Sequence, residues 1–573
     1  MHPDGPRAGV TPDWPGSTVR DIGLDDLINA LKVDLRYRAR VRPLMLTLSG
    51  DERVIRYRQE VLDDLLNAPG LRLAFEGLLP RLADLRDYRD LQRHEGTPLE
   101  VTIWRLRELN DCLLLTQGIL DALNAGGTAL TSQALLALRE QLAGLSMDEA
   151  YVAMRRELPR LMAMAPRLGS VTLGVNLDER LQFSEVTVVA VNDRRYRGSS
   201  LLGKLIGRSG DPFQGSGPLH DTGPAASGNS LPFFLPIAAL IRPTEPPQAR
   251  PIMEDLNRLL GPVFMPINSA LTQFSYVTSE LIMHLGPELA LLLAAASLVT
   301  TVRAAGLPMC RPVILPAEAR MGRVEGLFDL TLALRGLDGD INTALGQSVI
   351  TNDLVFDDEG RVLVLTGPNG GGKTTYTRAV GQAQALFQAG LYVPGISAEF
   401  SPVDAIYTHF PAEEKPGQDQ GRLAEESERL GEIFARATDK SLVLLNESLA
   451  STSPGESLYM ARDVVRGLRL LGVRAIYNTH LHDLAAGVDE MNADTPGTSV
   501  ISSLVAGVEL SGERPEDAAR RTYRIRRGPP LGLSFAREIA SRYGISYPKI
   551  AERVAARVAE QVLAAADSAS TRG

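Results

Sequence analysis

The sequence predicts a multidomain protein, with a mainly α-helical first part that carries a small β-rich insert, followed by a C-terminal α/β domain. Three observations predict this fold class. Apolar residues recur three and four positions apart from residue 24 onward, the period of a helix with one buried face. Short β-branched runs interrupt that period near residue 171. From residue 349, apolar runs alternate with helical segments, which is typical of a largely parallel sheet.

The composition is that of a globular protein long enough, at 573 residues, for about three or four domains. The net charge of -9 gives no bulk sign of nucleic-acid binding, although a local basic surface can bind DNA on an acidic protein. Cys112 and Cys310 lie far apart, which favours two reduced thiols over a disulfide or a metal site. The longest apolar stretch, 289–302, is shorter than a membrane span. We therefore expect a soluble cytoplasmic protein without a membrane partner.

The pattern divides the chain into five segments. They are a Pro/Gly-rich disordered tail (1–20), the first part of a helical core (21–170), a β-rich clamp-like insert (171–250), the return of the helical core (251–330) and the α/β domain (331–573). Within the insert, residues 207–230 contain too few apolar residues to pack, so we expect a flexible loop there.

A glycine-rich motif follows the buried apolar run "VLVL": Gly367 to Thr374 spell G-x-x-x-x-G-K-T, and an apparent helix begins at once. Glycines let backbone N–H groups turn toward phosphates, and a helix N-terminus adds its positive end. Lys373 can reach the β- and γ-phosphates, and the Thr374 hydroxyl can bind Mg²⁺. The order of strand, loop and helix disfavours a glycine-rich turn without function. The predicted ATP-binding residues are Gly367, Pro368, Asn369, Gly370, Gly371, Gly372, Lys373, Thr374 and Thr375.

A second buried strand, "SLVLLNE", ends in polar residues where ligands of α/β sheets bind. We expect Glu447 to orient or deprotonate the attacking water. Asn446 stands where an NTP-hydrolysing enzyme usually has an aspartate, and its carbonyl can still hold Mg²⁺ through a water. Because it lacks the negative charge, we expect weaker Mg²⁺ binding and slow turnover. The alternative is that Glu447 is only a solvated strand end.

A third strand, "GVRAIYNTHLHDLA", is followed by His480, which can reach the γ-phosphate and report its presence. A lone histidine is more often structural, but its place after a strand favours a catalytic role with Lys373 and Glu447. We expect His482 at the surface.

Together these segments resemble the MutS family, mismatch-repair ATPases of the ABC class. The resemblance is carried by "TGPNGGGKTTYTRAVGQAQALFQAGLYVPG", "ARATDKSLVLLNESLASTS" and "NTHLHDL", and by a similarity of "DERVIRYRQEVLDDLLNAPG" to the start of that family's helical lever core. It implies that 331–573 is an ABC-type P-loop ATPase domain with C-terminal dimerisation helices. It also implies a homodimer with two composite ATP sites and levers that reach toward nucleic acid.

Several features of the sequence differ from the MutS pattern and change what the resemblance implies. The family's mismatch-reading and connector domains have no room before residue 21, so we expect a short member that lacks both. Gly421 takes the place of the family's serine that contacts the other subunit's γ-phosphate. Val349 or Ile350 stands where an adenine-stacking aromatic is expected, so base selectivity is expected to be loose.

A basic cluster with one aromatic residue precedes the predicted flexible loop, and such a cluster suits phosphate contacts plus base stacking. Its members are Arg194, Arg195, Tyr196, Arg197, Lys204 and Arg208. A solvated charged surface explains the cluster equally well. We expect a slow ATPase that clamps on distorted, branched or mismatched DNA. The alternatives are an ATP-driven switch on a ribosome or a protein complex, and a weakly hydrolysing nucleotide-binding scaffold. A nuclease is disfavoured, since the residues after the ATPase region contain no metal-binding cluster.

Overall fold

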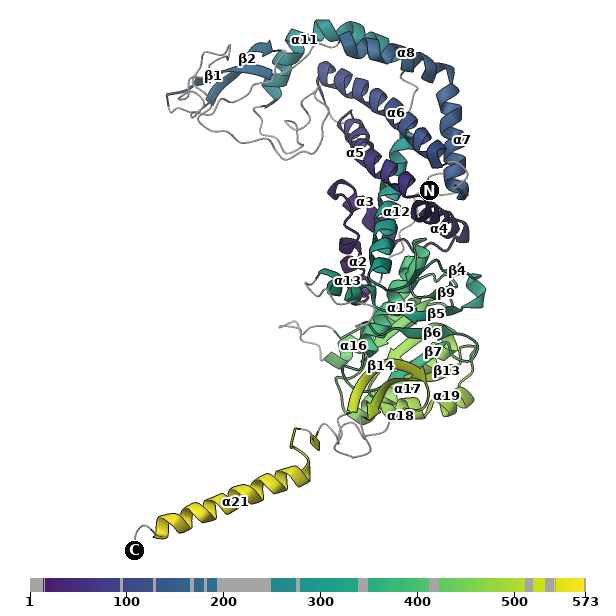
Figure 1. Cartoon of the computed structure of the whole chain (residues 1–573), viewed down its shortest axis with the longest axis vertical. Coiled ribbons are helices and arrows are strands. Elements are labelled where there is room, and N and C mark those ends of the chain that lie inside the picture. Colours follow the sequence, from purple (N-terminus) through teal and green to yellow (C-terminus); the bar gives the residue numbers. More distant parts are fainter. Residues whose placement is uncertain are drawn as a thin grey trace. The chain divides into compact units, whose positions relative to one another are not determined.

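The structure is a computed structural model, and it divides into two compact units that are described separately (Figure 1). The sheet unit comprises Met1–Glu76, Ala125–Ala137 and Pro287–Gly573, and the helical unit comprises Gly77–Asn124 and Leu138–Gly286. The described residues are 14, 16–92, 96–126, 130–164, 170–179, 183–192, 249–274, 279–338, 349–411, 422–510, 519–530, 540–541 and 543–570. The predicted flexible loop at 207–230 lies outside them.

The helical unit is built on long helices whose apolar sides form one core. The elements with residues in this unit are α5 (Pro69–Gln92), α6 (Pro98–Gly126), α7 (Gln133–Met147), α8 (Glu149–Met164), α11 (Ala249–Leu271), η2 (Thr272–Phe274) and α12 (Glu280–Ala304). Leu106 of α6, Met154 of α8 and Ile267 of α11 are buried in that core. The buried carboxylate of Glu108 accepts a hydrogen bond from the Ser279 hydroxyl at 2.6 Å, so the polar group inside the unit is paired.

Two antiparallel strands belong to the helical unit, β1 (Ser170–Leu177) and β2 (Phe183–Asn192). Val188 and Val191 of β2 pack against the helical core, and the Thr187 hydroxyl donates to Asp255 of α11 at 3.3 Å. The β-branched run that marked the β-rich insert therefore forms a hairpin-like strand pair beside α11.

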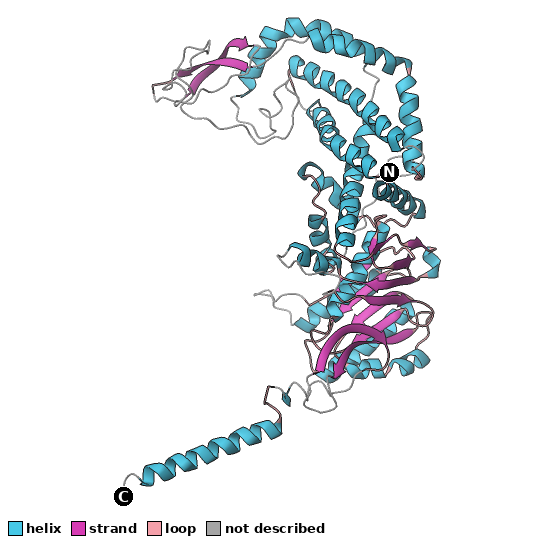
Figure 2. Cartoon of the chain, in the orientation of Figure 1, coloured by secondary structure: helices cyan, strands magenta, loops and turns pink. Residues whose placement is uncertain are grey.

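The sheet unit contains a six-stranded sheet, which Figure 2 shows in magenta with helices around it. Its strands, in spatial order, are β10 (Ile406–His409), β11 (Leu442–Asn446), β12 (Arg474–Asn478), β7 (Val362–Thr366), β13 (Ile501–Leu510) and β14 (Ala519–Arg527). The first five are parallel, and β14 is antiparallel to β13. At this level the predicted fold class, a helical part plus an α/β domain with a largely parallel sheet, is confirmed.

Both faces of this sheet are covered, which explains why its inner strands β7 and β11 are nearly continuous apolar runs. Alternate residues such as Val364 and Val443 pack against one set of helices. On the other face α15 lies so close that a Cβ built on Gly381 would be 3.0 Å from Leu444. The surrounding helices are α15 (Lys373–Gln388), α16 (Arg422–Arg436), α17 (Pro454–Leu471), α18 (His482–Ala486) and α19 (Val488–Asp494).

The N-terminal helices belong to the sheet unit, which the division into sequence segments did not anticipate. They are α1 (Thr18–Asp21), α2 (Leu24–Ala30), α3 (Leu35–Leu46) and α4 (Glu52–Asn67), and α13 (Leu330–Asp338) lies against α2. Buried glutamines of α15 bind them: Gln382 donates to the Ile22 carbonyl at 3.0 Å and Gln388 to the Ser49 carbonyl at 3.1 Å. Among the described residues, the first helix thus begins at Thr18, which is buried and lies inside the segment predicted as a tail.

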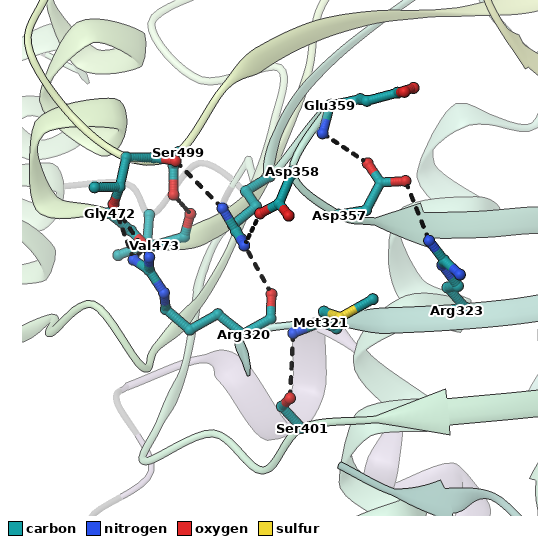
Figure 3. A network of polar contacts seen from close by, with 12 residues as sticks. Arg320, Met321, Arg323, Asp357, Asp358, Glu359, Ser401, Gly472, Val473 and Ser499 are labelled. Carbon is teal, nitrogen blue, oxygen red and sulfur yellow. Dashed lines mark hydrogen bonds and ion pairs between the residues drawn. The ribbon is translucent and has the colours of Figure 1, made fainter. Parts of the chain in front are cut away.

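A second sheet is joined to the six-stranded sheet by polar contacts near the start of β12, where Arg320 binds a backbone carbonyl (Figure 3). Its strands are β4 (Val313–Ile314), β9 (Ser397–Phe400), β5 (Gly322–Leu327) and β6 (Asn352–Phe356), and β3 (Met309–Cys310) pairs with β8 (Val393–Pro394) nearby. Arg320 follows η3 (Ala317–Ala319) and donates to the Gly472 carbonyl at 2.8 Å. Arg474 donates to the carbonyls of Met321 and Ser401, both at 2.9 Å, and burial lowers its pKa to about 9.

Among the described residues, α12 is the one helix with the length and hydropathy of a membrane span. The apolar stretch 289–302 lies inside this helix, but the helix begins earlier and has 25 residues. Of its most apolar window, 56% is buried within the protein, and burial of this kind is typical of a core helix. The last described helix is α21 (Tyr547–Ser570).

Candidate functional site

The residues between β7 and α15, 367–372, form a tight loop that we call the glycine loop. Three of its residues have positive φ angles: Gly367 at 141°, Gly370 at 70° and Gly372, the N-cap of α15, at 90°. A Cβ built on Gly367 would lie 2.7 Å from the Cβ of Ala506 on β13. The loop therefore needs glycine both for its backbone angles and for its close approach to the neighbouring strand.

Lys373, the first residue of α15, is buried and turns back over the glycine loop. Its Nζ donates to the carbonyls of Gly367 at 3.0 Å and Pro368 at 3.2 Å. Burial lowers the pKa of Lys373, and the negative charge of Glu447 opposes that shift. The predicted catalytic lysine and glutamate therefore lie close enough for their charges to interact, although Lys373 begins helix α15 and Glu447 follows strand β11.

Thr374 and Asn446, the two predicted metal-binding residues, are brought together by the fold. The Thr374 hydroxyl donates to Oδ1 of Asn446 at 2.9 Å. The same oxygen accepts a short hydrogen bond from the Asn478 amide, because Asn446 of β11 pairs with Asn478 of β12 in the sheet register. Oδ1 of Asn478 is buried and has no hydrogen-bond partner among the described residues. Two side-chain oxygens, from Thr374 and Asn446, thus meet at the carboxyl end of the sheet, with the Asn478 amide beside them.

Glu447 directly follows β11 and is half-buried. Its φ angle of 50° lies in the left-handed region, which is uncommon for a residue with a Cβ. Its N–H donates to the Asn478 carbonyl at 2.8 Å. This hydrogen bond therefore fixes the backbone of Glu447, from which the side chain extends at the carboxyl end of the sheet.

The two histidines after β12 differ in burial. His480 is exposed, whereas His482, which we expected at the surface, is half-buried at the start of α18. Burial and the positive charges of Lys373 and His480 lower the pKa of His482, and its Nδ1 is buried without a hydrogen-bond partner in the described part of the chain. Both histidines are thus candidates for contact with a ligand on the glycine loop.

Two side chains of β14 lie against the glycine loop, and the sequence analysis did not identify them. A Cβ built on Gly370 would be 2.8 Å from Nη1 of Arg521, and one built on Gly372 would be 3.4 Å from the Tyr523 ring. Tyr523 has a φ angle of 56°, and Asn352 donates to its carbonyl at 3.0 Å. The segment "ARRTYRIRR" is rich in arginine and contains one tyrosine, but no local pattern places that strand beside the loop.

Several predicted site residues fall outside the described part of the chain. These are Gly421 and the whole basic cluster: Arg194, Arg195, Tyr196, Arg197, Lys204 and Arg208. Their proposed contacts with a second subunit and with nucleic acid remain predictions.

Comparison with known proteins places this site in a family domain. Residues 363–526 match the family model described as MutS domain V. The match covers β7, the glycine loop, Glu447, both histidines and the two β14 residues.

Curated relatives are similar to part of the chain. The protein named DNA mismatch repair protein MutS 2 of Halobacterium salinarum is 30% identical over 243 residues, which is 41% of this chain and 27% of the relative. The DNA mismatch repair protein MutS of Chlorobium limicola is 36% identical over 29% of this chain and 19% of its own length. Endonuclease MutS2 of Thermus thermophilus is 29% identical over 38% of this chain and 30% of its own length. The chain thus spans less than a third of the length of these relatives.

Proposed function

We propose that this chain, which belongs to the MutS family because residues 363–526 match MutS domain V, is an ABC-class ATPase. In this proposal, ATP hydrolysis is coupled to the binding of distorted, branched or mismatched DNA. The observation that carries the ATPase proposal is the convergence of Lys373, Thr374, Asn446 and Glu447 at one edge of the sheet. The DNA proposal rests on relatives named for DNA mismatch repair.

The residues at the site fit ATP and Mg²⁺. Glycine at position 367 lets the loop pass close to Ala506 of β13, where a Cβ would collide, and backbone N–H groups at a helix N-terminus suit phosphate. The hydroxyl of Thr374 and the amide oxygen of Asn446 are hard oxygen donors, the kind that Mg²⁺ prefers. The buried Oδ1 of Asn478, without a partner in the described residues, adds an acceptor for a metal-bound water. When bound, Mg²⁺ would supply positive charge to the β- and γ-phosphate oxygens.

Each residue then has a defined role. Lys373 exchanges its carbonyl partners Gly367 and Pro368 for the β- and γ-phosphates. Glu447 orients the attacking water and accepts its proton. His480 or His482 contacts the γ-phosphate, and Arg521 adds a second cation above the loop. Because Asn446 brings no charge to the metal, turnover is slow.

We also propose a homodimer with composite ATP sites. Its support in the described residues is α21, which exposes apolar side chains at helical spacing: Tyr547, Ile550, Val554 and Val558. A second copy of this helix would cover them. The contact across the dimer to the γ-phosphate is assigned to the segment that contains Gly421.

DNA affinity measured by fluorescence anisotropy tests the proposed coupling. The probes are single-stranded, fully paired, mismatched and branched DNA, each titrated with ATP and with ADP at one moderate salt concentration, since phosphate contacts weaken as salt rises. We expect one distorted or branched shape to bind at least about tenfold more tightly than paired DNA in one nucleotide state. Equal, weak affinity for all four would favour a ribosome or a protein complex as the partner.

Replacing Asn446 with aspartate tests the proposed metal site. The aspartate keeps both hydrogen bonds to Oδ1, from Thr374 and Asn478, and adds a charge beside the metal. We expect the Mg²⁺ concentration for half-maximal hydrolysis to fall about three- to tenfold, because charge-assisted bonds are stronger than neutral ones by about 1 kcal/mol. The same charge change at exposed Asn29 on α2 is the control. An unchanged Mg²⁺ requirement and rate would remove Asn446 from the metal site.

A further inference from the structure

The turn that follows the proposed catalytic glutamate has an unusual backbone. Glu447 has a φ angle of 50° and Leu449 one of 63°, and neither is glycine. Left-handed angles are unfavourable for residues with a Cβ, and more so for a large side chain such as leucine. A turn with two such residues persists only when its surroundings hold it in place. We call residues 447–449 the glutamate turn.

Hydrogen bonds from two strands and one helix hold the centre and the end of this turn. The Tyr477 hydroxyl on β12 donates to the Ser448 carbonyl at 3.0 Å, and the Ser457 hydroxyl on α17 donates to the Leu449 carbonyl at 2.7 Å. Nδ1 of His409, the last residue of β10, is 2.7 Å from the Ser448 hydroxyl. Burial, followed by the charge of Arg429, lowers the pKa of His409 to about 4, so this ring is neutral at physiological pH.

A further contact to this turn comes from a charged residue on α16. Oε2 of Glu426 accepts a hydrogen bond from the Leu449 N–H at 2.8 Å. Glu426 is only 8% exposed, and a hydrogen bond from a backbone N–H to a buried carboxylate is stronger than one between neutral groups. This bond reaches directly to one of the two left-handed residues, two positions after Glu447.

We propose that Glu426 is a positioning residue for ATP hydrolysis: its carboxylate fixes the Leu449 N–H, and through the glutamate turn it sets the direction of the Glu447 side chain. This inference rests on the proposed function of Glu447 as the residue that orients water. A shift of α16 that breaks the Glu426 bond releases the glutamate turn, and hydrolysis slows while ATP stays bound. The helix that begins beside the proposed subunit contact thereby controls the hydrolytic residue.

The test compares Glu426→Ala with Glu426→Gln, and Glu428→Ala on the exposed side of the same helix is the control. Hydrolysis is measured without DNA, and ATP affinity is measured with a fluorescent analogue. Glu426→Ala should lower kcat by about 10- to 100-fold, since small misplacements of reacting groups have effects of that size. Its affinity for the analogue should stay within about twofold of wild type, because Glu426 binds the glutamate turn, which orients water rather than nucleotide in this proposal.

Rescue by the conservative variant separates positioning from a general loss of structure. Glu426→Gln keeps an oxygen that can accept from Leu449, so we expect kcat within about threefold of wild type. If Glu426→Ala does not fold, Glu426→Asp, which is one methylene shorter, should show the same selective loss of kcat. Wild-type kcat in the folded Ala or Asp variant would overturn this inference alone. A wild-type protein that does not hydrolyse ATP would overturn the proposed function together with it.

Discussion

Replacing Glu447 with glutamine is expected to lower kcat for ATP hydrolysis by at least about 100-fold, because a positioned general base contributes about 10²- to 10⁴-fold. ATP affinity should remain within about twofold of wild type. The glutamine has the same shape and keeps the left-handed backbone position, but it cannot accept a proton. Lys373, Thr374 and Asn446, which bind the phosphates and the metal in this account, are unchanged.

Single-turnover hydrolysis and analogue binding measure the two quantities separately for the Glu447 variant. Glu432→Gln, an exposed position on α16, is the matched control and should behave as wild type. If Glu447→Gln hydrolysed ATP at the wild-type rate, Glu447 would be a solvated strand end, the alternative that the sequence left open.

Replacing Gly367 with alanine is expected to remove ATP binding and to destabilise the sheet unit. The φ angle of 141° at Gly367 is open essentially to glycine alone. The new Cβ would lie 2.7 Å from the Cβ of Ala506 and 3.1 Å from its carbonyl oxygen, on a strand that pairs with β7. Backbone strain and overpacking together should lower the free energy of unfolding by about 2–5 kcal/mol. ATP affinity should fall at least about tenfold, since the loop N–H groups would turn away from the phosphates.

Thermal or urea unfolding and analogue binding test the Gly367 prediction. Gly455→Ala, in the first turn of α17, is the control, because a Cβ built there meets nothing within 4 Å. That variant should be as stable as wild type or slightly more stable, by up to about 1 kcal/mol. Wild-type ATP affinity in Gly367→Ala would mean that the glycine loop does not hold the nucleotide.

The elements of the fold could be predicted where a short stretch of sequence carries its own pattern of apolar residues. The runs "VLVL" and "LVLLN" are buried on both faces, and such continuous apolar runs identify parallel strands directly. The place of the N-terminal helices could not be predicted, because it depends on contacts such as Gln382 to Ile22, between residues 360 positions apart. No periodicity in either segment indicates its distant partner.

The residues of the candidate site likewise fall into those with a local sequence signal and those placed by long-range contacts. Thr374, Asn446 and Glu447 could be predicted as site residues because each lies at or beside the end of an element with a clear local pattern. The sequence did not point to Asn478, Tyr523 or Glu426, because their places depend on tertiary structure. Sheet order and register bring β12 and β14 beside the site, and the packing of α16 brings Glu426 to the glutamate turn. His482 was expected at the surface because a single sequence does not show that α18 packs against β7.

Steady-state ATP hydrolysis by the purified protein shows whether the site formed by the glycine loop and Glu447 is an ATPase site that responds to DNA. The rate would be compared with that of Lys373→Ala, alone and with single-stranded, paired, mismatched and branched DNA at one moderate salt concentration. We predict a slow rate that the Lys373 variant lacks and that one distorted or branched DNA changes by several-fold. A rate equal to that of Lys373→Ala under every condition would contradict the account, since it would mean that this site does not hydrolyse ATP.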